Sequence, residues 1–476
     1  MKRLAILSAL LLFAGAHAAP LPETVKQELK KAGIPLNAIA VDVREVSKHA
    51  PLISLNAKRA MNPASTMKLL TTYAGLDLLG PAYTWKTEAY IDGELKDGVL
   101  NGNLILKGYG DPKFTIEQFW LWLRELRARG LREIRGDLVI DRSYFDLPAY
   151  DPAAFDNDPV RAYNVGPDAL LLNFNTLRLR YTPNGNGMKI DTEPQLDGLK
   201  LDNQLAPSLP SGNCDGWDDT ILIQTDGDNV RLQGGYPSDC GEREHNLSIL
   251  PHTRYIESLF RAVWQEVGGT LKGGLREAAT PTSAQLFSTH RSEPLSGIIR
   301  DINKFSNNVM ARQLFITLAS TSYRPSLAAE WGMTAVSLNT ERSIETVHDW
   351  LQRQHLNFPE LVLENGAGLS RKERISAQHM AQLLQSASDH PLSSELQSSL
   401  PILGVDGSVK KRLKESPAAS HAHLKTGTLE GVKTIAGYVR SKHGKEWIVV
   451  FFINHANAKR GTDAQDALIE WVHQRH

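Results

Sequence analysis

The sequence is poor in cysteine and has no net charge, and both features exclude functions. Two cysteines among 476 residues exclude a disulfide-dense scaffold and a four-thiolate metal site. The 53 basic and 53 acidic residues balance, which argues against a nucleic-acid partner held by phosphate neutralisation. The G-x-S-x-G, H-E-x-x-H, C-x-x-C and P-loop motifs are missing, which removes several common enzyme classes.

Long apolar runs are also missing, except for one at the N-terminus. A basic pair at residues 2–3 precedes the apolar segment 4–15, and an A-x-A cleavage site ends at Ala18. This is the pattern of a secretory signal peptide. The run is too short for a membrane span, which needs about 20 apolar residues. We expect cleavage after Ala18 and a periplasmic protein that is soluble or peripheral to the membrane; the alternative is a buried first helix.

Export makes a disulfide between the two cysteines the favoured interpretation, because an exported compartment is oxidising. Cys214 and Cys240 lie in a polar stretch rich in Asp, Asn and Gly. We therefore predict one disulfide between them that closes a local loop. The alternative is two free, buried thiols.

The spacing of apolar residues changes twice along the chain. Residues 37–46 alternate like a strand, and 66–79 have the pattern of a largely buried helix. From about 84 to 280, short alternating segments and Gly turns indicate a β-rich region. From about 294, apolar residues again have the spacing of amphipathic helices. The end predicts three strands and a helix, at 421–428, 433–441, 446–454 and 462–474. One domain split by a β-rich insertion explains this order.

Three short motifs carry the candidate chemistry. They are S-x-x-K with Ser65 and Lys68, S-x-N with Ser306 and Asn308, and K-T-G at 425–427. Each motif is weak alone, and a second S-x-x-K begins at Ser408. Context favours Ser65, because a strongly apolar helix follows it, whereas a run of basic residues follows Ser408.

These residue types suit a serine nucleophile that is activated by a lysine. A serine hydroxyl needs a base, and a lysine is a base only when burial or a nearby cation lowers its pKa. Lys68 lies one helical turn after Ser65 and is expected to be near Lys425. We expect Ser306 to relay a proton to the leaving amine, and Asn308 to hold a substrate carbonyl and fix Lys68.

The K-T-G segment is expected to bind the end of the substrate. Lys425 and the hydroxyls of Thr426 and Thr428 can receive a terminal carboxylate, with Gly427 between them. Backbone N–H groups of Ser65 and Thr428 would form an oxyanion hole, in which each donor typically contributes about 3–4 kcal/mol. The alternative is three accidental tripeptides with ordinary surface lysines.

With these motifs the chain resembles the low-molecular-mass class C penicillin-binding proteins, the D-alanyl-D-alanine carboxypeptidase/endopeptidases with inserted domains. Further segments that carry the resemblance are 108–112, 136–138, 173–175, 366–371 and 400–407. The resemblance implies an α/β (α+β) multidomain fold. Its penicillin-binding/β-lactamase-like transpeptidase domain has an antiparallel sheet with helices on both sides, interrupted by two nested β-rich domains. The expected boundaries are 19–84 and 281–476 for the catalytic domain, 85–175 and 250–280 for inserted domain II, and 176–249 for inserted domain III.

One segment departs from the family pattern. The family usually has Asp-Gly-Ser-Gly where this chain has Asn-Gly-Ala-Gly at 365–368, so a hydroxyl is missing. The loop geometry is expected to be kept. Arg371, three residues further on, is carried over as a candidate for the substrate pocket. Its alternative role is structural, as an arginine that braces the loop.

The resemblance implies a reaction on peptidoglycan stem peptides. Ser65 would attack a D-Ala–D-Ala or D-Ala–diaminopimelate bond, and water would release the acyl-enzyme, without a metal ion or an organic cofactor. β-Lactam antibiotics would label Ser65 covalently. Two alternatives stay open: a β-lactamase or esterase on the same fold, and a non-catalytic cell-wall binding module.

Overall fold

The computed structural model describes residues 19–476 except 186, 211 and 323–336. The predicted signal peptide, at 1–18, lies outside the described residues. In the part of the chain that is described, no helix is both long and apolar enough to cross a membrane.

The start and the end of the chain share one antiparallel sheet of five strands. Its order is β18-β19-β20-β1-β2. The strands are β18 (Ala422–Leu429), β19 (Val432–Arg440), β20 (Glu446–Asn454), β1 (Ile39–Glu45) and β2 (Ile53–Leu55). Ile39 of β1 pairs with Ile453 of β20, so the first and last strands of the chain are neighbours at its centre. The predicted strands near both ends are therefore parts of one sheet.

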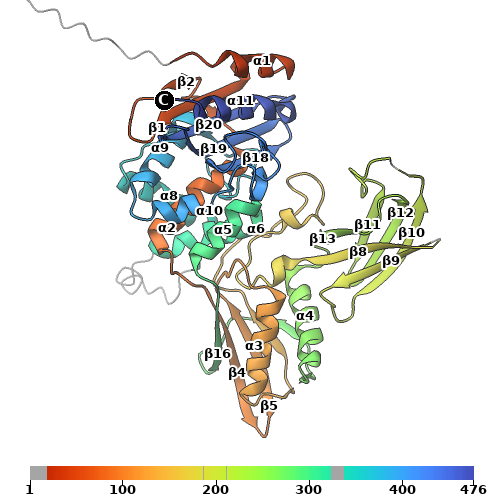
Figure 1. Ribbon diagram of the computed structural model, residues 1–476. Coiled ribbons are helices and arrows are strands. Elements are labelled where there is room, and N and C mark those ends of the chain that lie inside the picture. Colours follow the sequence, from red (N-terminus) through yellow and green to blue (C-terminus); the bar gives the residue numbers. More distant parts are fainter. Residues whose placement is uncertain (1–18, 186, 211, 323–336) are drawn as a thin grey trace, which may run out of the picture.

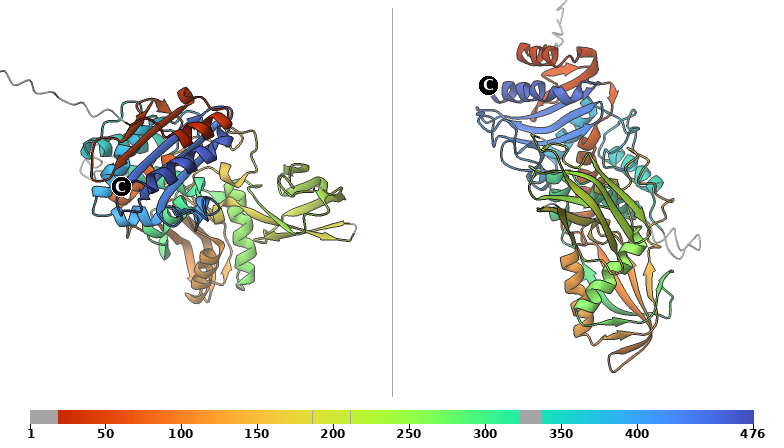
Figure 2. Two further views of the ribbon diagram at one scale, coloured as in Figure 1. Left: turned by 45° about the horizontal axis from the view of Figure 1, so that its top comes forward. Right: turned by 90° about the vertical axis from the view of Figure 1, so that its right-hand side faces the viewer.

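Helices cover both faces of this sheet (Figure 1, Figure 2). On one face lie α1 (Glu23–Lys31) and α11 (Thr462–His473). On the other lie α2 (Lys68–Leu79), α5 (Leu295–Phe305), α6 (Asn308–Leu318), α8 (Thr340–Arg353), α9 (Ala377–Asp389) and α10 (Ser393–Ser399). Alternate residues of β20 enter the two cores, Val449, Phe451 and Ile453 on one face and Ile448, Val450 and Phe452 on the other. The run 447–453 is apolar without alternation because both faces are buried.

The chain between α2 and α5 builds a second region with its own core. A seven-stranded sheet contains β14, β6, β5, β4 and β16 in this order, with β7 and β15 attached to it. These strands are β4 (Lys86–Lys96), β5 (Val99–Gly108), β6 (Glu133–Ile134), β7 (Leu138–Asp141), β14 (Thr270–Leu271), β15 (Leu275–Glu277) and β16 (Gln285–Arg291). Two helices pack on it, α3 (Ile116–Ala128) and α4 (His252–Glu266).

Two three-stranded sheets extend from this region to one side of the molecule (Figure 1). One has the order β13-β8-β9 and the other β10-β12-β11. The strands are β8 (Leu177–Asn184), β9 (Gly187–Glu193), β10 (Lys200–Ser208), β11 (Ile221–Asp226), β12 (Asn229–Pro237) and β13 (Arg243–Leu247). The structure joins Cys214 to Cys240 in a disulfide here, as the sequence predicted.

The structure adds detail to the predicted β-rich region. The helices α3 and α4 lie inside it and were not predicted. The range 281–476 was assigned to the catalytic domain, yet β16 pairs antiparallel with β4 of the inserted sheet. We therefore propose that the insertion runs to Arg291 and that the chain returns to the catalytic part at 292–294.

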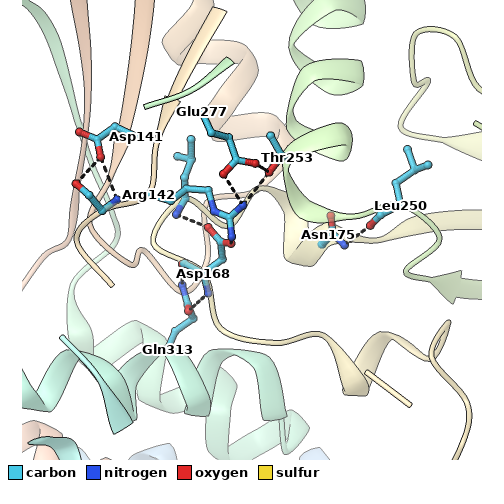
Figure 3. Close-up of polar contacts among 10 residues, drawn as sticks. Asp141, Arg142, Asp168, Asn175, Leu250, Thr253, Glu277 and Gln313 are labelled. Atoms are coloured by element: carbon cyan, nitrogen blue, oxygen red, sulfur yellow. Dashed lines mark hydrogen bonds and ion pairs between the residues drawn. The ribbon is translucent and has the colours of Figure 1, made fainter. Parts of the chain in front are cut away.

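A buried polar contact joins the inserted region to α6 (Figure 3). The Gln313 side chain accepts a hydrogen bond from the backbone N–H of Asp168 at 2.9 Å and donates to its carbonyl at 2.7 Å. The Asp168 carboxylate pairs with Arg142 at 2.9 Å, and Arg142 reaches Glu277 at 3.3 Å. The helix that begins with Asn308 is thus tied to the insertion by side chains as well as by the chain itself.

Candidate active site

Ser65 lies in a tight turn that leads into α2. The turn is a 3-10 helix over Ala64–Met67, and Ala64 has a positive φ of 45°. The Asn62 side chain accepts a hydrogen bond from the Ala64 N–H at 2.9 Å. Asn62 is itself bonded through its backbone N–H to Asn454 of β20 at 2.9 Å. The serine is therefore held against the sheet by its neighbours in sequence.

Lys68 is fully buried and points back to Ser65. Its Nζ lies 3.1 Å from the Ser65 Oγ and 2.6 Å from the Asn308 Oδ1, and it donates to the Ala367 carbonyl. Burial lowers the pKa of Lys68 well below its ordinary value, and the Lys425 and Arg312 cations lower it further. A neutral amine at this distance can accept a proton from a serine hydroxyl.

The S-x-N motif lies at the junction of two helices. α5 ends at Phe305, and Ser306 adopts a left-handed conformation with φ 56°. Asn307 caps α6 by accepting from the Met310 N–H at 3.0 Å. This sharp junction places Ser306 and Asn308 at the same edge of the catalytic core, where Asn308 reaches Lys68 and Ser306 reaches Lys425.

Lys425 is the second fully buried lysine of the site. Its Nζ donates to the Ser306 Oγ at 2.9 Å and to the Thr426 carbonyl at 2.8 Å. Burial lowers the pKa of Lys425 to about 7. A bound carboxylate would raise the pKa of Lys425 and so favour its ammonium form. The three sequence motifs thus meet in one hydrogen-bonded cluster.

Strand β18 approaches Ser65 so closely that Gly427 has no room for a side chain. A Cβ there would lie 2.7 Å from the backbone nitrogen of Ser65 and 2.4 Å from the Thr434 hydroxyl. A Cβ at Gly368, which has a φ of 77°, would lie 2.8 Å from the same nitrogen. Both glycines therefore allow backbone to pack against the nucleophile. This brings the strand that carries Thr428 beside Ser65, where the predicted oxyanion donors lie.

Ser408, the serine of the competing S-x-x-K, lies beside the K-T-G strand. Its Oγ is 2.7 Å from the Thr426 Oγ1, and the Lys411 side chain is exposed. Sequence reasoning gave Ser408 no place near the chemistry. The distance to Thr426 makes it a neighbour of the expected carboxylate site.

Arg371 lies at the rim of the site and is half exposed. Its Nη1 donates to the Glu430 carbonyl at 3.1 Å, in the turn between β18 and β19. Its guanidinium lies over the Phe155 ring, 4.8 Å from the centroid. These contacts brace the loop of Arg371 against the turn after β18 and against the segment around Phe155. The rest of the guanidinium is exposed at the rim of the site.

The unusual loop 364–368 rests on a carboxylate that sequence reasoning missed. Glu373 is fully buried, and its Oε1 accepts hydrogen bonds from the backbone N–H groups of Glu364, Asn365 and Gly366. A two-stranded pairing of β17 (Ile375–Ser376) with β3 (Ala60–Met61) fixes the segment beside the Ser65 turn. A glutamate among charged neighbours gave no signal of burial.

Comparisons with known proteins identify the family of the chain. The model of the D-Ala-D-Ala carboxypeptidase 3 (S13) family matches residues 21–475. The chain is 26% identical over 423 residues to a D-alanyl-D-alanine carboxypeptidase DacB of Haemophilus influenzae, covering 86% of this chain and 84% of that protein. It is 27% identical over 454 residues to a D-alanyl-D-alanine carboxypeptidase of Actinomadura sp. strain R39, covering 90% of this chain and 80% of that protein.

A solved structure shares the fold. The crystal structure of penicillin binding protein 4 (dacB) from Haemophilus influenzae superimposes with a TM-score of 0.78 at 23% identity, covering 95% of this chain and 99% of that chain. The predicted fold class and the resemblance to class C penicillin-binding proteins are confirmed. The chain belongs to the D-Ala-D-Ala carboxypeptidase 3 (S13) family, and is a serine-type D-Ala-D-Ala carboxypeptidase of that family.

Proposed function

We propose that Ser65 is the nucleophile and Lys68 its general base in the cleavage of peptidoglycan stem peptides. The observation that supports this most directly is the 3.1 Å contact between the Nζ of the fully buried Lys68 and the Oγ of the partly exposed Ser65. The hydroxyl proton passes to the lysine as the Oγ–carbonyl bond forms. Backbone N–H groups of Ser65 and Thr428 receive the oxyanion.

The second half of the reaction uses the cluster around Ser306. The proton gained by Lys68 must reach the leaving amine as the peptide bond breaks. The Ser306 hydroxyl, held by Lys425 at 2.9 Å, is the relay in this proposal. Asn308 keeps Lys68 in place through the 2.6 Å contact. Water then hydrolyses the acyl-enzyme, and Ser65 is restored.

Specificity for a free carboxylate rests on Lys425. The ammonium group and the hydroxyls of Thr426 and Thr428 can hold the carboxylate of a terminal D-alanine, with the Thr426 hydroxyl already oriented by Ser408 at 2.7 Å. Penicillins carry a carboxylate in a comparable position, so β-lactams are expected to acylate Ser65. Arg371 is a further candidate for contact with the stem peptide.

A groove beside Ser306 supports cleavage of cross-linked peptides as well. It has a volume of about 490 Å³ and runs from 305–309 to the start of α3 and to Arg178 of the insertion. This is a typical volume for a site that binds a ligand much larger than one amino acid. A carboxypeptidase releases only D-alanine, whereas an endopeptidase must hold a second stem peptide on the leaving side. The groove therefore favours a DD-endopeptidase activity beside the carboxypeptidase activity.

The proposed setting is the periplasm, after removal of residues 1–18. An exported enzyme acts where peptidoglycan is exposed, and the disulfide between Cys214 and Cys240 suits an oxidising compartment. Cell fractionation together with N-terminal sequencing of the mature protein checks this point. A chain that begins at residue 1 in the cytoplasm would contradict it.

Penicillin labelling tests the site. Wild-type protein and Ser408→Ala are expected to form a covalent adduct with benzylpenicillin at Ser65, and Ser65→Ala none, as read by intact mass spectrometry. Labelling of Ser65→Ala at the wild-type level would overturn the assignment. An adduct that hydrolyses within seconds would favour a β-lactamase instead. Peptidoglycan binding without any D-alanine release would favour a binding module.

Purified muropeptides test the two activities separately. Loss of D-alanine from monomers and cleavage of cross-linked dimers are scored in the same digest. Asn246→Trp narrows the groove and is expected to slow dimer cleavage more than D-alanine release. Thr225→Trp, on the exposed strand β11, is the matched control. Equal effects of Asn246→Trp on both substrates would contradict the role of the groove.

A further inference from the structure

Glu373 is a fully buried carboxylate beneath the loop that faces Lys68. Its Oε1 accepts from three successive backbone N–H groups, those of residues 364, 365 and 366, at 3.1, 2.9 and 2.9 Å. The other oxygen, Oε2, has no hydrogen-bond partner in the described part of the structure. A buried charge with an unshared oxygen is costly, so a compensating interaction is required.

The loop held by Glu373 is bonded on its other side to α2. The Ala367 carbonyl accepts from Lys68, and the Gly366 carbonyl accepts from the Thr71 hydroxyl at 2.6 Å. The three N–H bonds of Glu373 thus hold the peptide groups that directly precede those whose carbonyls receive α2. Through this adjoining backbone they support the position of the Lys68 amine.

The charge of Glu373 also opposes the two cations near the base. Lys68 faces Lys425 of β18 and Arg312 of α6, which disfavour its ammonium form, and Glu373 favours that form. Glu373 in turn faces Lys68, while Arg312 faces both Glu373 and Glu364. Burial raises the pKa of Glu373, whereas the three N–H donors and Lys68 favour the ionised carboxylate.

We propose that Glu373 is a positioning residue that sets the protonation balance of Lys68, by aiming the Ala367 carbonyl at the amine and by placing one negative charge near it. This rests on the proposed role of Lys68 as the base. Without Glu373, the two flanking cations would leave the amine neutral but would weaken its capacity to take the serine proton. With Glu373, Lys68 accepts the proton and holds it until Ser306 transfers it onward.

The test compares pH profiles of penicillin acylation. Glu373→Gln keeps the shape of the side chain and an acceptor oxygen but removes the charge, so the pKa of Lys68 should fall. The acid limb of the acylation profile, where the rate drops as Lys68 is protonated, is therefore expected to move to lower pH by about one unit. Glu373→Ala loses the three N–H bonds and is expected to acylate more slowly at every pH. Glu88→Gln is the matched control and keeps the wild-type profile, because Glu88 is a buried glutamate that accepts hydrogen bonds from Tyr90 and Tyr109 in the inserted sheet, outside the site.

The outcomes separate this inference from the proposed function. If the acid limb of the acylation profile stays in place or moves to higher pH in folded Glu373→Gln, the role of Glu373 is overturned. Labelling of Ser65→Ala overturns the proposed nucleophile instead. Carbon-13 NMR of the Glu373 carboxyl in the wild-type protein gives a readout that needs no stable variant. The carboxyl is expected to be ionised wherever acylation is fast, and a neutral carboxyl there contradicts the inference.

Discussion

The active site and the outer sheets of the inserted region differ in where they place charge. Lys68 and Lys425 are fully buried, and their hydrogen-bond partners are neutral oxygens. In the insertion, Arg231 pairs with Asp202 at 2.8 Å while both side chains stay about half exposed. Exposed pairs contribute about 0–1 kcal/mol each, whereas burying a charge costs stability and shifts its pKa. The catalytic centre gives up stability for reactivity, whereas this exposed pair in the outer sheets of the insertion does not bear that cost.

The largest expected effect comes from crowding the nucleophile. Gly427→Ala places a Cβ 2.7 Å from the Ser65 nitrogen, so the turn or the strand must move. A shift of about 1 Å in a catalytic group costs about a hundredfold in rate, which is the fall we expect in penicillin acylation. Gly187→Ala in β9, where the nearest atom would be 3.8 Å away, is the control and should change nothing. Wild-type rates for Gly427→Ala would show that the site tolerates displacement.

The next effect is confined to the insertion. Replacement of Cys214 and Cys240 by serine removes the cross-link, and a native disulfide typically stabilises by about 2–4 kcal/mol. We expect lower stability in urea unfolding followed by limited proteolysis of 176–249, with unchanged D-alanine release from a small peptide. Loss of D-alanine release would mean that the active site depends on the folded state of residues 176–249.

Stability itself should reveal the buried base. Lys68 has a folded-state pKa below its unfolded value, so the unfolded chain binds a proton more readily than the folded protein, which lowers stability at any pH below the unfolded pKa. Lys68→Met is therefore expected to raise unfolding stability by about 1–2 kcal/mol at pH 7, and this gain should shrink above about pH 10. Arg231→Met, which breaks an exposed pair, should change stability by less than about 0.5 kcal/mol. A destabilised Lys68→Met would contradict the comparison.

The smallest effect is a gradual loss of carboxylate binding at alkaline pH. Burial lowers the pKa of Lys425 to about 7, so its ammonium form, which we propose binds the substrate carboxylate, is lost as the pH rises through that value. For a peptide that ends in free D-alanine, KM is expected to rise by up to about tenfold per pH unit above about 7. The corresponding C-terminal amide should lack this alkaline limb. The same limb for both peptides would place the titration elsewhere.

Local patterns were sufficient for much of the catalytic part. The final strands and helix follow from apolar runs and helical periodicity, and the motifs around Ser65, Ser306 and Lys425 meet as their residue types require. The helix α3 was missed although Phe119, Trp122, Leu123 and Leu126 have helical spacing, because the surrounding strands dominated that stretch. Its signal was present in the sequence.

Other features depend on contacts that no local pattern contains. The pairing of β16 with β4 joins two ends of the insertion, so the sequence could not show that β16 belongs to it. Glu373 stands between Lys372 and Arg374, and a run of charges normally indicates an exposed loop. Its burial is decided by the backbone of residues 364–366, which folds over it.

The central sheet, in which Ile39 pairs with Ile453, makes the fold depend on both ends of the chain. Ser65 and Lys68 are synthesised early, but Lys425 and the strands that complete the sheet come near the end of the chain. Folding must close this very long loop, and such non-local pairing is slow. A chain interrupted before β18 lacks Lys425 and the three strands that complete the sheet beside β1. We therefore expect D-alanine release only from chains that extend through β20.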